Sequence, residues 1–190
     1  MIPSIEMCFH LMDKYQMLEN IKAHSIVVAK VAHLIARSLR NAGFDISLKK
    51  TTTGALLHDI GKTISLNSGE NHAEIGQQIC LENHFYEIAD IVKEHVILKD
   101  YNLSDNYSEK EIVYYSDKRV NHDKIVTLEE RLNYILGRYG RNQERLHKLI
   151  KENFNLCKKV EEKLFSKIDF SHELLAHLVK RDLCITALFP

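Results

Sequence analysis

The sequence has very few residues that interrupt helices. Its two prolines stand at the extremes, Pro3 and Pro190, and glycine occurs only seven times in 190 residues. Proline and glycine are the strongest breakers of regular structure, so their scarcity argues against a turn-rich β fold. The alternation of apolar and polar residues that marks half-buried strands is nearly absent too. Together these absences predict an all-α fold.

Long apolar runs and closely spaced cysteines are also missing. No stretch approaches the roughly 20 apolar residues that span a bilayer, and no basic region followed by an apolar one stands at the N-terminus. The four cysteines, Cys8, Cys80, Cys157 and Cys184, show no CxxC spacing. Such scattered cysteines are typical of reduced thiols, some of them core residues. We therefore expect a cytoplasmic protein without disulfides and without a membrane partner.

Net charge is absent as well. Lys and Arg together number 26, as do Asp and Glu, so the formal net charge is zero. No overall field attracts the chain to nucleic acid, which is not an expected partner. The length and the 45% hydrophobic content suit one domain, residues 1–190, with a substantial core.

What the sequence does contain is a series of amphipathic helices. Apolar residues recur at helical spacing from Met17 to Leu39, and Gly43 is a natural end for that helix. Ser108 with Glu111, and Thr127 with Glu130, form capping-box patterns that open two later helices. The expected helices are 17–39, about 53–60 with caps in 51–53, 72–83, 86–97, 108–120, 127–139, 142–168 and 171–188, and the expected loops are 67–71 and 99–107.

His24 lies in the apolar stripe of the first expected helix. Each residue advances about 100° around a helix, which places His24 within about 40° of Val28, Val31 and Ile35. A buried imidazole needs a hydrogen-bond partner or a metal. The sequence alone leaves both readings open. His33 falls on the opposite side and is expected to be solvated.

The adjacent pair His58-Asp59 follows the apolar run 55–57. A carboxylate on the core side of a helix is costly unless a cation accompanies it, and an imidazole beside it suggests a shared divalent metal. A polar pair at a helix end is the alternative, although Asp near a helix C-terminus opposes the helix dipole.

Three further residues extend this candidate site. His95 and Asp117 each fall on the apolar face of a predicted helix, and His72 begins the helix 72–83. A solvated helix N-terminus is the alternative for His72. The combined pattern places six nitrogen or oxygen ligands on five consecutive helices, all facing one centre.

These residues carry a resemblance to a known family. The order His24, His58-Asp59, Asp117 resembles the H…HD…D signature of HD-superfamily metal-dependent phosphohydrolases, and the string 58–62 is similar to their HDIG variant with its following lysine. His72 and His95 resemble the two extra histidines of dinuclear members. The resemblance covers about residues 16–125, and it implies an HD-domain helical bundle followed by a helical extension, about 126–190.

The resemblance also implies a ligand set and a chemistry. His24, His58, Asp59 and Asp117 would hold one divalent metal, and Asp59 would bridge to a second held by His72 and His95. Fe or Mn is expected, with Mg, Co, Ni or Zn as alternatives. Metals at this site would activate a water so that hydroxide attacks phosphorus. Asp59 and Lys62 are the candidate catalytic residues, because Lys62 could bind a phosphate oxygen in the transition state.

The expected substrate is a phosphorylated small molecule, most simply a nucleotide. The chain looks most like small bacterial HD proteins that include the symmetrical diadenosine tetraphosphate hydrolases. It has no GYP motif, and so departs from the cyclic-di-GMP phosphodiesterase branch. Lys118 and Arg119 are further candidates for substrate contact, with surface charge as the alternative. A homodimer is possible through the extension.

Two alternative functions remain open from the sequence. One is a mononuclear phosphatase similar to HD 5′-nucleotidases, in which His72 and His95 would position phosphate. The other is a non-catalytic protein that binds a nucleotide or a metal as a regulator. Metal content and a substrate panel would separate the three.

Overall fold

The structure, a computed structural model, describes residues 1–99, 101, 103–104, 106–140, 143–182 and 187. This part of the chain is predominantly helical, which confirms the all-α prediction; its strands form one two-stranded antiparallel hairpin. In chain order the elements are α1 (Ile5–Lys14), α2 (Glu19–Asn41), α3 (Leu48–Leu57), α4 (Lys62–Ser68), α5 (His72–Glu82), α6 (Tyr86–Glu94), α7 (Glu109–Lys118), β1 (Val120–Asn121), β2 (Lys124–Ile125), α8 (Leu128–Tyr139), α9 (Glu144–Phe165), the 3₁₀ helix η1 (His172–Leu174) and α10 (Leu175–Arg181).

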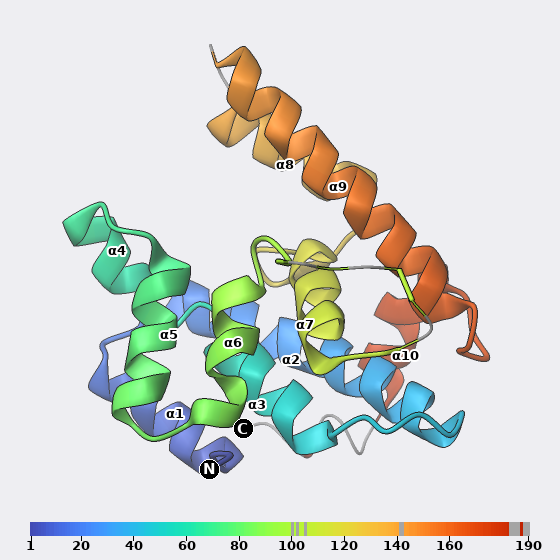
Figure 1. The fold of residues 1–190 in the computed structure, drawn as a ribbon, viewed down its shortest axis with the longest axis horizontal. Helices are drawn as coiled ribbons and strands as arrows, with labels where there is room; N and C mark the ends of the chain where they lie inside the picture. The colour runs from blue at the N-terminus through green and yellow to red at the C-terminus, as the bar shows by residue number, and fades with distance from the viewer. Residues whose placement is uncertain (100, 102, 105, 141–142, 183–186, 188–190) are drawn as a thin grey trace.

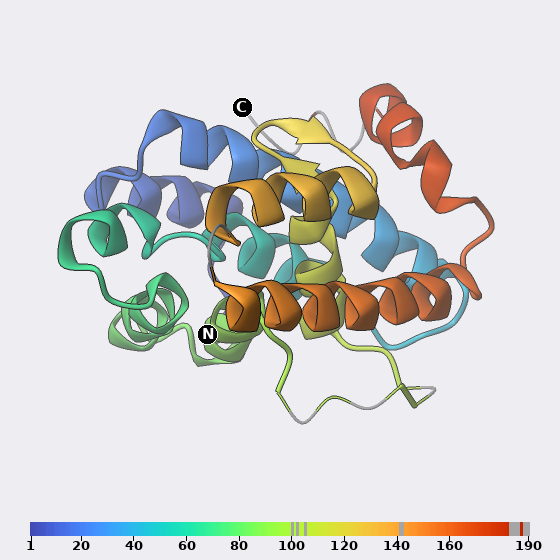
Figure 2. The ribbon, with the colours of Figure 1, turned by 90° about the horizontal axis from the view of Figure 1, so that it is seen from above.

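Helix α2 is the centre of the fold. Its buried face runs the length of the helix, from Ile21 to Leu39, because apolar residues recur there every three or four positions. Helices α3 and α7 pack against it, and α6 packs against both α3 and α7 (Figures 1 and 2). This arrangement brings the ends of α3 and α6 and the last turn of α7 together near His24, in the second turn of α2.

Helices α8 and α9 form a hairpin that projects from this body (Figure 1). Only the second half of α9 is firmly anchored: Phe154, Cys157, Val160 and Leu164 are buried, whereas Leu149 is 53% exposed. Helix α10 returns to pack against α2. The buried apolar residues from α1 to α10 form one cluster.

The start of α3 differs from its prediction. The N-cap is Ser47, whose hydroxyl accepts from the backbone N–H of Lys50 at 3.2 Å, and not one of the threonines 51–53. Those threonines are buried inside the helix, where each hydroxyl donates to the carbonyl oxygen four residues earlier. This local bond satisfies a buried hydroxyl without a cap, and sequence reasoning mistook it for a capping signal.

Other elements were missed or mistaken. Helix α1, helix α4 and the β1–β2 hairpin were not predicted, and α4 begins where the sequence suggested only the end of a helix. His33, predicted to be solvated, is half-buried, and its Nδ1 lies 2.9 Å from Oγ1 of Thr52. Both capping boxes are confirmed, at α7 and α8.

The cysteine prediction is supported where it can be examined. Cys8, Cys80 and Cys157 are buried free thiols, and Cys184 lies outside the described residues. Within the described ranges, no helix is both long and apolar enough to cross a membrane.

Candidate metal centre

Two histidines of the site stand where helices end. His58 caps the C-terminus of α3, and His95 caps the C-terminus of α6. The last carbonyls of a helix lack partners within it. The Nδ1–H of His58 donates to the carbonyl of Ala55 at 2.7 Å, and that of His95 donates to the carbonyl of Val92 at 2.6 Å. A carbonyl can only accept, so both rings carry their proton on Nδ1 and turn Nε2 toward the site.

His24 is oriented in the same way by a residue that the sequence reasoning missed. Its Nδ1–H donates to the carbonyl of His122, at 2.8 Å, in the turn of the β1–β2 hairpin. His122 has a φ of 54°, a left-handed conformation that suits a tight turn. The hairpin was not foreseen, so no sequence signal led to this contact. His72, the first residue of α5, completes the set of imidazoles and is more exposed, at 27% of its side chain.

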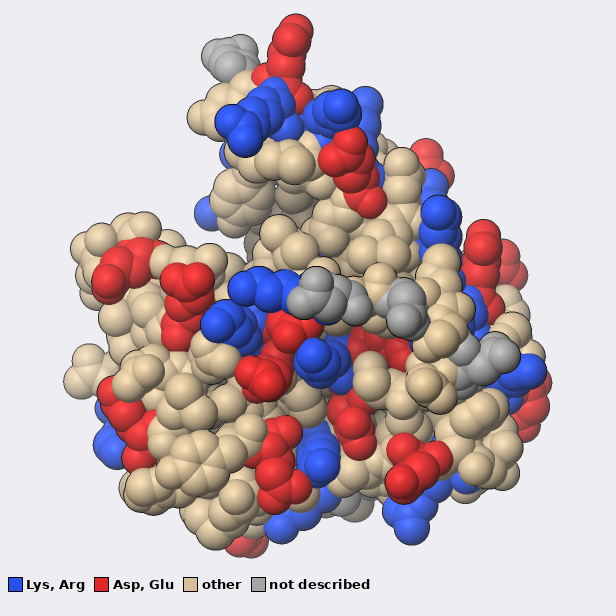
Figure 3. All heavy atoms as spheres, in the orientation of Figure 1, with Lys and Arg blue, Asp and Glu red and all other residues tan. Residues whose placement is uncertain are grey.

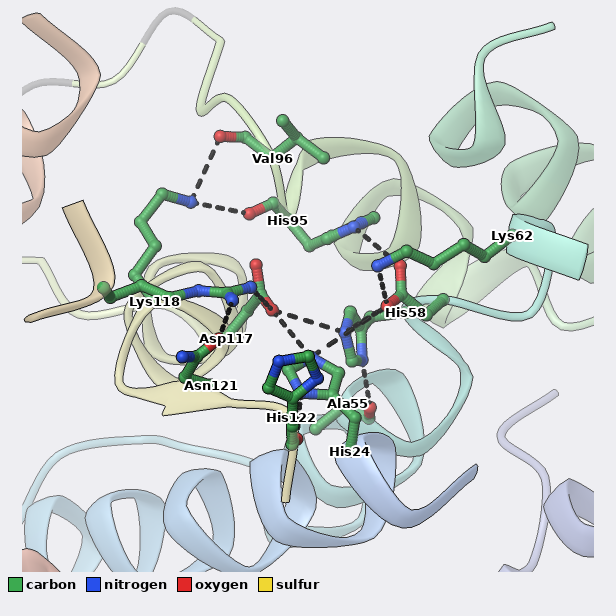
Figure 4. A network of polar contacts seen from close by, with 12 residues as sticks. His24, Ala55, His58, Lys62, His95, Val96, Asp117, Lys118, Asn121 and His122 are labelled. Carbon is green, nitrogen blue, oxygen red and sulfur yellow. Dashed lines mark hydrogen bonds and ion pairs between the residues drawn. The ribbon is translucent and has the colours of Figure 1, made fainter. Parts of the chain in front are cut away.

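The carboxylate of Asp59 lies between the histidines and is only 1% exposed. Figure 4 shows His24, His58 and His95 gathered at this centre with Lys62 and Asp117. Its Oδ1 lies 3.5 Å from Nε2 of His72 and 3.5 Å from Nε2 of His95. Its Oδ2 lies 3.4 Å from Nε2 of His58 and 4.0 Å from Nε2 of His24. The two oxygens of one carboxylate therefore face two different pairs of imidazoles.

Asp117, in the last turn of α7, closes the Oδ2 side. Its Oδ1 lies 3.0 Å from Nε2 of His24 and 3.6 Å from Nε2 of His58. The six residues predicted as metal ligands thus converge on one centre, as the sequence reasoning expected.

The donor set fits a divalent metal. Two groups of three residues each bring their ligand atoms within 4.8 Å of one another: His24, His58 and Asp59, and Asp59, His72 and His95. Ligands held about 2.1 Å from an ion lie roughly 3–3.5 Å apart, close to the spacings observed. Within the described part of the chain, Nε2 of His58 and Oδ1 of Asp59 are buried without a hydrogen-bond partner. Such orphaned atoms are costly, and cations on the two sides of Asp59 would satisfy both.

The electrostatics of the site agree with this reading. Burial would raise the pKa of Asp59, but His58 and Lys62 hold it well below its usual value. Burial alone would lower the pKa of His58, yet the carboxylates of Asp59 and Asp117 raise it to about 10. Burial lowers the pKa of His72 to about 4. In the absence of a metal, a proton on His58 and the ammonium of Lys62 balance the two carboxylates.

Lys62 reaches the site from the first turn of α4. Its Nζ donates to Oδ2 of Asp59 at 2.7 Å, and 37% of its side chain is exposed. The sequence reasoning placed Lys62 beside the site, and the structure does so as well, with the ammonium on the carboxylate that the two histidine pairs share.

The structure does not support the predicted substrate contacts of Lys118 and Arg119. Both are 4% exposed, and their charges are bound to the protein. Nζ of Lys118 donates to the carbonyls of His95 and Val96, each at 3.1 Å. The guanidinium of Arg119 donates to Glu161 at 2.9 Å and to the carbonyl of Val126 at 2.7 Å. These two residues join α7 to its neighbours and do not face a ligand.

Arg131 of α8 is a cation at the site that the sequence reasoning did not name. Its Nη2 lies 4.0 Å from Oδ1 of Asp117, and its Nη1 donates to Oδ1 of Asn121 at 2.9 Å. It falls in the predicted helix 127–139, which was treated as an extension without a motif. The sequence carries one signal for this role, which is that Arg131 shares a helix face with Tyr134.

Comparison with known proteins assigns the family. The family model described as "HD domain" matches residues 21–152. This chain belongs to the HD domain family. The match includes all six converging residues, confirms the resemblance seen in the sequence, and continues past residue 125 into α9.

The matched relatives fall into two kinds. One is the uncharacterized protein MJ0778 of Methanocaldococcus jannaschii, 29% identical over 147 residues, which are 70% of this chain and 85% of that protein. The other kind is named ribonuclease Y: the Treponema pallidum protein is 43% identical over 61 residues, 32% of this chain but 11% of its own length. That of Mycoplasma capricolum is 36% identical over 78 residues, 14% of its length. No solved structure matches the chain significantly.

Proposed function

We propose that this chain is a metal-dependent phosphohydrolase that cleaves a phosphoester or phosphoanhydride bond of a nucleotide or dinucleoside polyphosphate. Membership of the HD domain family supports the general class. The name ribonuclease Y, borne by several relatives, describes cleavage of a phosphoester bond too, although the matched segment is a small part of those proteins.

The observation that carries the proposal is the convergence of acceptors. The Nδ1–H groups of His24, His58 and His95 are bound to carbonyls, so each Nε2 is turned toward the carboxylates of Asp59 and Asp117, and deprotonated Nε2 atoms there present lone pairs beside negative charge. Lone pairs and carboxylates repel one another at these distances unless a cation lies between them. A site built only for stability would not need to gather so many acceptors.

We assign His24, His58, Asp59 and Asp117 to one metal and Asp59, His72 and His95 to a second. The two oxygens of Asp59 face these two sets, which supports its role as the bridge. Bound metals would supply an acidified water as nucleophile and would neutralise phosphate oxygens. Mn or Fe suits mixed imidazole and carboxylate ligands.

Residues of the chain supply the remaining interactions with metal and substrate. The charges of His58 and Lys62 hold Asp59 ionised in spite of its burial, so it can bind cations at neutral pH. Lys62 places an ammonium at the edge of the site, where it would bind a non-bridging phosphate oxygen as charge develops in the transition state. The partly exposed His72 leaves a side of the site open to substrate.

The experiment combines metal counting with a substrate panel. The protein is purified without chelator, its metal is counted, and hydrolysis is measured with Mn²⁺ or Fe²⁺ on nucleotides, dinucleoside polyphosphates and a chromogenic phosphate ester. We expect about two metals per chain, and loss of both metal and hydrolysis in Asp59→Asn. The matched control is Asp45→Asn, which neutralises an exposed carboxylate.

Two results would change the assignment. One metal per chain with full turnover would favour the mononuclear phosphatase. Tight nucleotide binding without turnover under every metal would favour a regulatory protein and would overturn the proposed hydrolysis.

A further inference from the structure

A second cationic surface adjoins the metal centre on α8. Arg131 is 12% exposed in its side chain and lies at the edge of the site, 4.0 Å from the carboxylate of Asp117. In the space-filling view, the surface is hollowed between the part of the molecule that carries α4 and α5 and the projecting α8–α9 hairpin (Figure 3). Helix α8 belongs to this hairpin, and its residue Arg131 lies beside the metal centre.

The guanidinium of Arg131 has more N–H donors than its contacts with the described residues use. It carries five N–H groups, and among the residues that the structure describes only Asn121 accepts from it at the distance of a normal hydrogen bond. Its Nε is buried and has no partner in the described part of the chain. The contact with Asp117 is an ion pair at 4.0 Å, too long for a hydrogen bond. The hydrogen bond to Asn121 is enough to hold α8 against β1. The remaining N–H donors therefore point to an acceptor on a bound ligand.

The charge of Arg131 leads to the same conclusion. Like charges in a partly buried site repel strongly. The carboxylate of Asp117 lies between Arg131 and the centre proposed to hold two divalent cations, but a metal would share its charge, so a further anion beside the guanidinium is favoured. Phosphate is the anion that arginine binds best, because its planar fork of donors matches two phosphate oxygens.

The same face of α8 carries an aromatic ring and a second arginine. Position 138 follows position 131 by nearly two turns, so the two arginines lie on one face roughly 10 Å apart along the axis. Arg131 lies over the ring of Tyr134, at 5.6 Å, and that ring packs against His122 at 5.2 Å. Arg138 is exposed, and its Nε donates to the hydroxyl of Tyr139 at 3.2 Å.

We propose that this face of α8 binds the phosphate chain of the substrate, with Arg131 on the phosphate nearest the metals and Arg138 on a further linked phosphate. The inference rests on the proposed function and deepens it: the preferred substrates carry two or more linked phosphates. Tyr134 lies between the arginines, where it can pack against a nucleoside. The extension of the fold thus supplies specificity to a centre built by α2 to α7.

The test measures the binding of two probes that differ by one linked phosphate. The Mn²⁺-loaded protein is titrated with adenosine monophosphate and with the methylene-bridged analogue of adenosine diphosphate, with Mn²⁺ in excess over nucleotide. We expect Arg138→Gln to weaken the diphosphate analogue about tenfold and to leave the monophosphate unchanged, because a charged hydrogen bond is worth roughly 10- to 100-fold in affinity. Arg131→Gln should weaken both probes by a similar factor with metal content unchanged.

Matched variants make the test decisive. Arg145→Gln removes an exposed arginine from the neighbouring helix α9 and should change neither affinity. Arg131→Lys keeps the charge but removes the planar set of guanidinium donors, so its loss of affinity for the probes should be intermediate. It replaces Arg131→Gln if that variant does not fold. Arg138 is exposed, so its variant is expected to fold in any case.

The inference is overturned if Arg138→Gln matches Arg145→Gln, if it weakens both probes equally, or if Arg131→Gln loses metal. Binding of a short single-stranded RNA, and not of the diphosphate analogue, in an Arg138-dependent manner would also overturn it. Arginine-dependent binding without hydrolysis of any substrate would leave this inference standing and would sink the proposed function. Hydrolysis that is unchanged by substitution of either arginine would overturn this inference and leave the proposed function standing.

Discussion

No side chain fits between Gly61 and His72. A Cβ atom on Gly61 would lie 2.3 Å from the carbonyl oxygen of His72 and 2.7 Å from the backbone nitrogen of Gly76. Both atoms belong to the backbone of α5, which cannot yield as a flexible side chain would. The glycine that follows the His58-Asp59 turn therefore lets α5 begin directly against it, and this approach brings His72 to 3.5 Å from Asp59.

Gly61→Ala should therefore damage the metal centre as well as the fold. We expect α5 to move away, at a cost of about 1–3 kcal/mol in unfolding free energy, typical of overpacking. The metal held by His72 and His95 should be lost before the metal on the other side of Asp59. Thermal unfolding and metal counting would show both effects.

Gly137→Ala is the control for this substitution. Apart from the adjoining backbone of α8 itself, no atom of the described residues lies within 4 Å of a Cβ at Gly137. Alanine there should stabilise the helix by about 0.5–1 kcal/mol and leave metal content alone. Full metal content in Gly61→Ala would mean that the close approach is not what places His72.

Lys62→Met should separate metal binding from turnover. The ammonium donates to Oδ2 of Asp59 but is not among the atoms proposed to ligate metal, so metal content should persist. Loss of a cation that stabilises the transition state should lower kcat by about 10²-fold. Steady-state kinetics on the best substrate of the panel would measure this, with the exposed Lys159→Met as control. An unchanged kcat would remove Lys62 from the catalytic residues.

Lys118 has a positioning role that can be tested separately. Its buried ammonium binds the carbonyls of His95 and Val96, and so joins α7, the helix of Asp117, to the residues that follow α6. Lys118→Met leaves both carbonyls without this donor, and the cost of such unsatisfied groups is about 1–3 kcal/mol each. We expect the affinity for metal to fall, with the larger loss on the His72 and His95 side.

Lys110→Met is the matched control for Lys118. It removes another lysine of α7 that contacts the end of α6, but Lys110 binds the side chain of Glu94 at 3.0 Å and is 39% exposed. Its loss should change metal affinity little. Equal effects of the two substitutions on calorimetric metal titrations would argue that Lys118 acts only through general stability.

The sequence predicted the ligands better than it predicted their surroundings. His24, His95 and Asp117 could be found because each is a polar residue on an apolar helix face, a local pattern of period 3.6. The contacts that orient the histidines could not be found in this way. The carbonyl of His122 lies 98 positions from His24 and reaches it only through a two-residue hairpin.

Lys118 and Arg119 show the opposite failure. Adjacency to Asp117 suggested that they face the ligand, but successive residues of a helix point about 100° apart. Their long side chains donate to backbone carbonyls and to Glu161 of α9. Glu161 lies far along the chain, so no local sequence pattern predicts this contact. Arg131 went unnoticed for the same reason, since its place beside Asp117 depends on how α8 folds back.

Metal affinity should rise with pH, because a proton on His58 competes with the metal. Burial alone would lower the pKa of His58, but Asp59 and Asp117 raise it to about 10. From about pH 6.5 to 8.5 the metal-free protein holds this proton, and metal binding expels it. The apparent affinity for Mn²⁺ should then increase by up to about tenfold per pH unit. His72, whose pKa burial lowers to about 4, is already neutral in this range and adds nothing.

The stability of the metal-free protein should change in the opposite direction. A folded-state pKa above the unfolded value of about 6.5 means that the proton on His58 stabilises the fold fully below that pH, and that this contribution is lost as the pH rises toward 10. Chelator-treated protein should therefore lose thermal stability from about pH 6.5 to 8.5, while metal-loaded protein should not, because its His58 is already deprotonated. Unfolding curves of both forms across this range, with competition titrations against a fluorescent chelator, measure the two slopes. If neither the metal affinity nor the stability of the metal-free protein changes with pH, His58 carries no proton in the metal-free protein.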